Sequence, residues 1–84
     1  MDEIDLVTSL LPAAEQQLNS PDTPFVKETY DRLLKTENLE SDEIMNMIAL
    51  CLADESNRVF IDQRAFDLER YNSLLKNLPS LPEA

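Results

Sequence analysis

The chain contains no glycine, and this absence limits the available folds more than any other feature of its 84 residues. Glycine best supplies the left-handed backbone of tight turns and the loops that cradle phosphates. Two-residue β-hairpins, P-loops and dinucleotide-binding fingerprints all depend on it. The sequence therefore indicates neither a hairpin-rich fold nor a common nucleotide-binding site.

Histidine is also absent, and there is a single cysteine. The chain thus lacks the commonest acid–base catalyst and metal ligand. Calcium loops need a glycine, and di-iron bundles need Glu-x-x-His pairs. A single cysteine cannot form an internal disulfide and suits a reducing cytosol. We therefore expect no enzyme, no cofactor, no metal site and no small-molecule substrate.

Two pairs of acidic residues are candidates for two-carboxylate chemistry, Glu40 with Glu43 and Asp54 with Glu55. Such chemistry requires that burial raise the pKa of one carboxyl group. Both pairs lie in polar stretches or near predicted helix ends. We expect all four carboxylates to be ionised and on the surface.

Three sulfur-containing residues, Met45, Met47 and Cys51, lie in the apolar stretch IMNMIALCLA at residues 44–53. Thioether and thiolate sulfurs are ligands for copper(I). Two residues that are two positions apart on a helix point about 200° apart, so Met45 and Met47 cannot converge on one ion. We interpret these side chains as packing residues.

Apolar side chains recur at helical spacing in the first part of the chain. Residues 2–19 place eight of them in one half of the helical wheel: Ile4, Leu6, Val7, Leu10, Leu11, Ala13, Ala14 and Leu18. This pattern predicts an amphipathic helix. Pro12 removes one backbone hydrogen bond inside it, so either one kinked helix or two short helices are expected.

Three further helices are predicted, over residues 24–36, 42–58 and 68–78. Pro24 suits the first helical position, and Asp22 or Thr23 can cap the helix that it begins. The third helix, with Ser41 as its N-cap, is apolar nearly all round, which is typical of a helix enclosed by several neighbours.

The fourth helix has Asp67 as its predicted cap, and Phe66 is placed to pack on Tyr71. Pro79 ends this helix and begins a short tail over residues 79–84. The sequence thus predicts a single all-α domain over residues 1–84, a small bundle of about four helices.

Acidic residues outnumber basic ones by seventeen to seven, which gives a net charge of −10. Residues 1–26 carry five acids and no base, and residues 36–57 carry six acids and no base. Such a field repels nucleic acids and anionic membranes and favours basic protein surfaces. The charge is also consistent with a role in solubility alone.

The acidic N-terminus does not resemble a secretory signal, and no apolar run is long enough to span a bilayer. We therefore expect a cytoplasmic protein. The ending FDLERYNSLLKNLPSLPE, residues 66–83, resembles the C-terminal segment of an uncharacterised family of small helical bacterial proteins, in which Phe-Asp, Arg-Tyr and LP-x-LP recur. The resemblance implies a bacterial origin and no activity.

These observations favour a non-enzymatic interaction module that binds a protein partner or forms a homodimer. The apolar surplus of residues 44–53 and the acids beside it are the predicted interaction residues: Glu37, Glu40, Asp42, Glu43, Met45 and Met47. The alternative is an acidic decoy that mimics nucleic acid and binds a basic protein groove. Binding that weakens steeply with salt would indicate the decoy.

Overall fold

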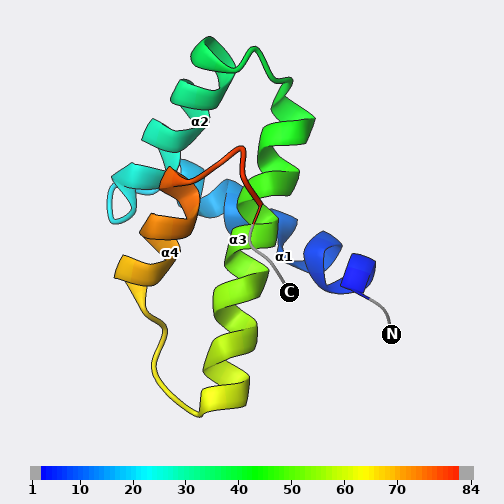
Figure 1. Cartoon of the computed structure of the whole chain (residues 1–84), viewed down its shortest axis with the longest axis vertical. Helices are drawn as coiled ribbons and strands as arrows, with labels where there is room; N and C mark the ends of the chain where they lie inside the picture. The colour runs from blue at the N-terminus through cyan, green and yellow to red at the C-terminus, as the bar shows by residue number, and fades with distance from the viewer. Residues whose placement is uncertain (1–2, 82–84) are drawn as a thin grey trace.

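The computed structural model describes the backbone of residues 3–81 and the side chains of residues 9–81. Within this part of the chain there are four α-helices and no strand (Figure 1). Their bounds are α1 Glu3–Leu18, α2 Pro24–Thr36, α3 Ser41–Asp62 and α4 Leu68–Lys76. The predicted all-α bundle is confirmed.

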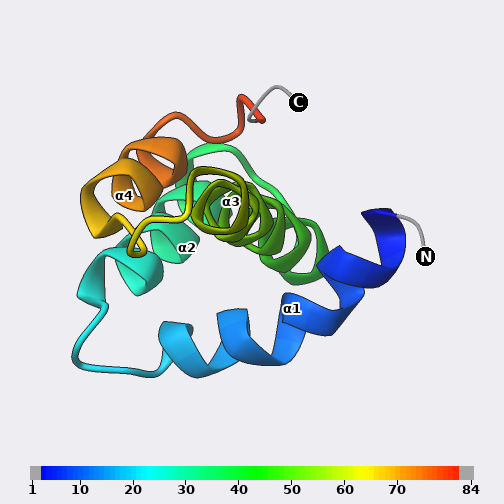
Figure 2. The same cartoon turned by 90° about the horizontal axis from the view of Figure 1, so that it is seen from below.

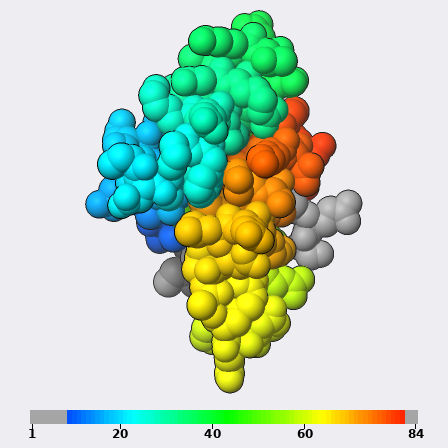
Figure 3. Space-filling model, turned by 90° about the vertical axis from the view of Figure 1, so that its left-hand side faces the viewer, coloured from blue at the N-terminus to red at the C-terminus, as the bar shows by residue number. Residues whose placement is uncertain are grey.

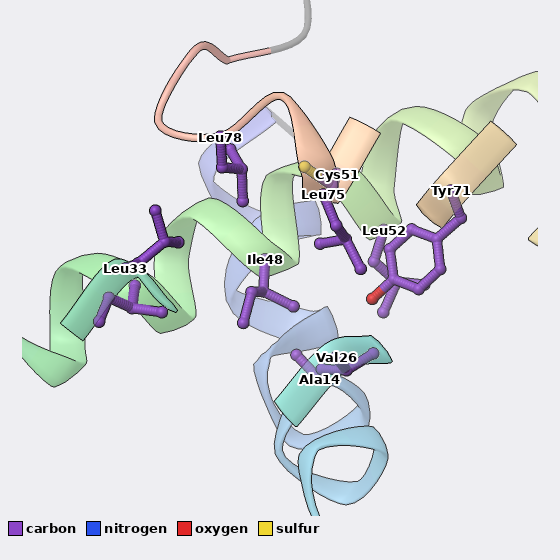
Figure 4. Packing of buried hydrophobic residues seen from close by; sticks show 10 residues of the cluster. Ala14, Val26, Leu33, Ile48, Cys51, Leu52, Tyr71, Leu75 and Leu78 are labelled. Carbon is purple, nitrogen blue, oxygen red and sulfur yellow. The ribbon is translucent and has the colours of Figure 1, made fainter. Parts of the chain in front are cut away.

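The long helix α3 is the centre of the bundle. It contacts α1, α2 and α4, and Figure 2 shows it nearly end-on with these helices around it. In Figure 4, Ile48 of α3 points toward Ala14 of α1 and Val26 of α2. The buried cluster draws on all four helices and on one residue after α4: Ala14, Val26, Leu33, Ile44, Ile48, Cys51, Leu52, Tyr71, Leu75 and Leu78. The predicted central helix is confirmed.

Helix α1 continues through Pro12 as one element, so the alternative of two short helices is not realised. Ala14 is fully buried, and Leu10, Ala13 and Leu18 pack against the core. The predicted apolar face is thus confirmed in the second half of the helix. The side chains of Ile4, Leu6 and Val7 lie outside the described residues.

Helix α2 begins at Pro24, as predicted, but its N-cap Thr23 makes no capping hydrogen bond. The Thr23 hydroxyl instead donates to the carbonyl of Gln17 at 2.8 Å, which ties the α1–α2 connection together. Further along α2, Arg32 donates to the carbonyls of Leu75 at 3.0 Å and Leu78 at 2.9 Å. The Leu75 carbonyl also accepts from the backbone N–H of Leu78 at 3.1 Å, so Arg32 adds a further donor there and ties α2 to the end of α4.

Helix α3 begins one residue earlier than predicted, so Glu40 and not Ser41 is its N-cap. The Glu43 side chain accepts a hydrogen bond from the Glu40 backbone N–H at 3.2 Å, which is one half of a capping box. The Ser41 hydroxyl accepts from Tyr30 at 2.8 Å instead. Local capping signals therefore identified the turn but not the capping residue.

The other end of α3 lies four residues beyond the predicted end at residue 58. Gln63 terminates the helix with a left-handed φ of 52°, and Asn38 has a φ of 55° in the α2–α3 connection. Glycine usually occupies such positions. In this chain longer side chains take its place.

Helix α4 begins as predicted and ends at Lys76, two residues before the predicted end. Asp67 caps it by accepting a hydrogen bond from the backbone N–H of Arg70 at 3.1 Å. The ring of Phe66 lies edge-on to Tyr71 with the centroids 5.6 Å apart. The predicted cap and the predicted packing of Phe66 on Tyr71 are both confirmed.

Candidate functional site

The most unusual side chain in the structure is Glu55, a carboxylate on α3 with no exposed surface. Arg64 donates two hydrogen bonds to it, from Nη1 to Oε2 at 2.6 Å and from Nη2 to Oε1 at 3.0 Å. Arg70 Nη1 donates to Oε1 at 2.9 Å, and the backbone N–H of Asp67 donates to Oε2 at 2.8 Å. Four donors therefore satisfy one buried anion.

These contacts determine the protonation of Glu55. The hydrogen bonds from Arg64, with smaller contributions from Asp67 and Arg70, lower the pKa of Glu55 from 4.5 to about 2, although burial acts in the opposite direction. The same contacts raise the pKa of both arginines. Glu55 is thus a permanent anion at neutral pH, and it lacks the raised pKa that a general acid requires.

The network extends to Asp54, which accepts a hydrogen bond from Arg70 Nη2 at 2.6 Å. Arg64 and Arg70 lie on the α3–α4 connection and on α4, so both arginines fold the chain back onto the last turns of α3. We name Asp54, Glu55, Arg64, Asp67 and Arg70 the carboxylate lock. It fixes the angle at which the chain leaves α3 and enters α4.

The expectation that Asp54 and Glu55 are surface carboxylates is wrong for Glu55, which is completely buried. Residues 36–57 also carry less unpaired negative charge than the sequence indicated. Two of their six acids are paired with Arg64 and Arg70. A helical wheel contains a signal for this burial. Glu55 lies seven residues after Ile48 and four after Cys51, and therefore continues the buried stripe of α3.

The predicted interaction residues divide into two groups. Glu37, Glu40, Asp42 and Glu43 are all exposed at the α2–α3 end of the molecule, and none forms an ion pair within the described part of the chain. Met45 and Met47 are partly buried and pack against the core.

Neighbouring helices cover most of the apolar stretch that suggested an interface. Within residues 44–53, only Asn46 is exposed. The apolar surplus of this stretch is therefore largely used in packing, and its role in binding stays a prediction.

Burial raises the pKa of the Cys51 thiol and of the Tyr71 hydroxyl in the core. Burial, with a smaller effect from Asp54, raises the pKa of Cys51 to about 12, so its thiol is protonated at neutral pH. Burial also raises the pKa of Tyr71, whose hydroxyl donates to Gln17 Oε1 at 2.7 Å and links α4 to α1. Among the described residues, no cluster of three or more Cys, Asp or Glu side chains could hold a metal ion.

Among the hollows lined by described residues, two lie against α2, and neither is lined by Cys51 or by a residue of the carboxylate lock. The larger, about 560 Å³, follows the α1–α2 connection and is lined by Leu18, Pro21, Pro24 and Lys27 among others. The smaller, about 330 Å³, includes Arg32 and Asn72, whose Oδ1 is buried without a hydrogen-bond partner. Both are open to solvent and bring together no set of groups that resembles a catalytic site.

The remaining feature is a set of exposed apolar side chains where α3 ends and α4 begins. Phe60 is 83% exposed and Ile61 57%, while Leu68 is 51% and Phe66 36% exposed. We name these four residues the apolar corner. Figure 1 shows the end of α3 extending past the other helices, and Figure 3 shows the segment coloured yellow as the narrow end of the molecule. The predicted end of α3 near residue 58 gave no indication of this surface, because the helix in fact continues to Asp62.

Comparison with known proteins gives no further guidance: no family model, no curated protein and no solved structure matches the chain. The resemblance of residues 66–83 to small bacterial proteins stays a prediction, and its last residues lie outside the described part. No helix that the structure describes combines the length and the apolar character needed to cross a membrane.

Proposed function

We propose that the protein is a non-enzymatic interaction module and that the apolar corner is its contact surface. The observation that carries the proposal is the 83% exposure of Phe60 beside Ile61, which is 57% exposed. Single exposed apolar residues are common on protein surfaces. Two adjacent large ones at a projecting helix end, with two more on the following segment, are typical of a surface that a partner covers.

The residues around this surface support the same proposal. Phenylalanine and arginine are enriched in protein interfaces, and Arg58 is exposed one turn before Ile61. The carboxylate lock holds the corner in place from the inside, through bonds of Glu55 to Arg64 and Arg70. A preorganised surface loses little conformational entropy when it binds.

A decoy of nucleic acid is the second candidate, and one observation favours it. Four exposed carboxylates, those of Glu37, Glu40, Asp42 and Glu43, lie at the end of the molecule opposite to the apolar corner. The pairing of Asp54 and Glu55 with arginines reduces the acidic surface open to a basic groove. The apolar corner therefore has the stronger support.

A comparative capture experiment separates the two candidates. The bait variants are Phe60→Gln with Ile61→Gln at the corner, Glu37→Gln with Asp42→Asn at the acidic end, and Leu34→Gln as the matched control. Leu34 is 42% exposed and lies on α2. We expect proteins retained by the wild type and by the other two variants to be lost from the corner variant alone, as measured by quantitative mass spectrometry.

The opposite pattern would contradict the proposal. A partner that tolerates the corner variant, but is lost from the acidic-end variant and is released by moderate salt, would establish the decoy.

A further inference from the structure

The end of α3 presents apolar surface whose size suits a small interface. The four side chains of the apolar corner together expose roughly 400 Å². Each partner in a standard protein–protein interface contributes about 800 Å². The corner with its polar neighbours Asn57 and Gln63 thus has the dimensions of a weak, reversible contact.

The charge distribution constrains what can cover this surface. Residues 1–57 carry three basic residues and thirteen acidic ones, whereas residues 58–76 carry four basic and three acidic ones. The corner therefore lies in the part of the chain with almost no net charge. A strongly basic partner would be drawn to the acidic end, and an acidic partner can contact the corner only if its own acidic segments face away from this protein.

A second copy of the chain avoids strong charge repulsion only in one arrangement. The exposed acids Glu37, Glu40, Asp42 and Glu43 lie at the start of α3, and the corner lies at its end. A helix of 22 residues is about 33 Å long. Two copies that meet corner to corner keep their acidic ends several screening lengths apart, since this length is about 8 Å at physiological salt.

We propose that two copies of this chain pair through their apolar corners, with Phe60 and Ile61 at the centre of the contact. This inference rests on the proposed function and names its partner. Two-fold pairing is the commonest assembly of soluble proteins, and it buries the same side chains on both copies. Each substitution at the corner therefore removes two contacts from the dimer.

Sedimentation equilibrium of the whole chain from about 1 μM to about 1 mM tests the pairing. We expect the wild type and Leu34→Gln to form dimers with equal dissociation constants. Phe60→Gln should weaken the dimer by about a hundredfold, because two buried phenylalanines are lost. Raising the salt should preserve or strengthen the wild-type dimer, since it screens the repulsion between two copies of charge −10.

Thermal unfolding controls for folding, because Phe60 is exposed and its replacement by glutamine should leave the monomer's stability unchanged. A wild type that remains monomeric throughout the range, or a dimer that Phe60→Gln does not weaken, would overturn the pairing. If such a monomer still captures a different protein through the corner, the pairing fails while the interaction module stands. If nothing binds through the corner, both fail.

Discussion

Arg64 binds both carboxylate oxygens of Glu55, at 2.6 and 3.0 Å, although these residues belong to opposite sides of the turn that ends α3. Glu55 is fully buried, whereas the Arg64 side chain remains 31% exposed. An anion inside a thin core is tolerated only when donors surround it. The pair therefore fixes the corner of the bundle that carries Phe60.

Glu55→Gln should destabilise the protein by about 3 kcal/mol at neutral pH, because it removes the charge that Arg64 and Arg70 bind. The free energy of unfolding from urea denaturation measures the effect. Glu69→Gln is the matched control, since Glu69 is exposed on α4 and should change stability by less than about 0.5 kcal/mol. Equal stabilities of the two variants would show that the lock contributes nothing.

The lock also predicts a pH dependence. The pKa of Glu55 is about 2 in the folded protein and 4.5 ordinarily, so the folded state favours the ionised form. The stabilisation is complete above pH 4.5 and is lost as the pH falls toward 2. This shift corresponds to about 3 kcal/mol.

Urea denaturation between pH 6 and pH 2 checks this dependence. The wild type should lose its stability advantage over Glu55→Gln across that window, while Glu69→Gln should follow the wild type throughout. A constant difference between wild type and Glu55→Gln down to pH 2 would contradict the assigned role.

Local sequence rules predicted the features that neighbouring residues determine. Asp67 and Phe66 precede an amphipathic segment that begins at Leu68, and the structure contains both the cap and the packing of Phe66 on Tyr71. The central position of α3 followed from an apolar surface too wide for one partner. These features depend on contacts within a few residues or on the amount of apolar surface.

Contacts between distant residues were not predictable in the same way. The carboxylate of Glu55 meets arginines nine and fifteen residues later, and their pairing depends on how the chain turns after Asp62. The residue at which α3 ends was equally difficult to predict. The predicted helix ends near residue 58, but α3 continues through Val59, Phe60 and Ile61, and Phe60 is 83% exposed.

Gln63 allows a test of the stability cost of placing a residue other than glycine in a left-handed conformation. Its φ of 52° is left-handed, which costs a side-chain-bearing residue about 1 kcal/mol. Gln63→Gly should therefore raise the free energy of unfolding by about 0.5 kcal/mol after the greater flexibility of the unfolded chain is included.

Asn38→Gly is the matched comparison, because Asn38 has nearly the same φ of 55° and asparagine tolerates it better. Its stabilisation in the same urea experiment should be smaller. A larger gain at Asn38 than at Gln63 would show that backbone strain does not determine stability at these turns.

The buried thiol of Cys51 should resist modification while the protein is folded. Cys51 has no exposed surface, and its pKa of about 12 leaves almost no thiolate at pH 8. The thiolate is the reactive form, so an aromatic disulfide reagent should react at the rate at which the core opens. The measurement follows the absorbance of the released thiol in the native buffer and in denaturing urea. Since Glu55→Gln makes opening more frequent, it should speed the native reaction, whereas Glu69→Gln should not; rapid labelling of the native wild type would contradict the burial of this thiol.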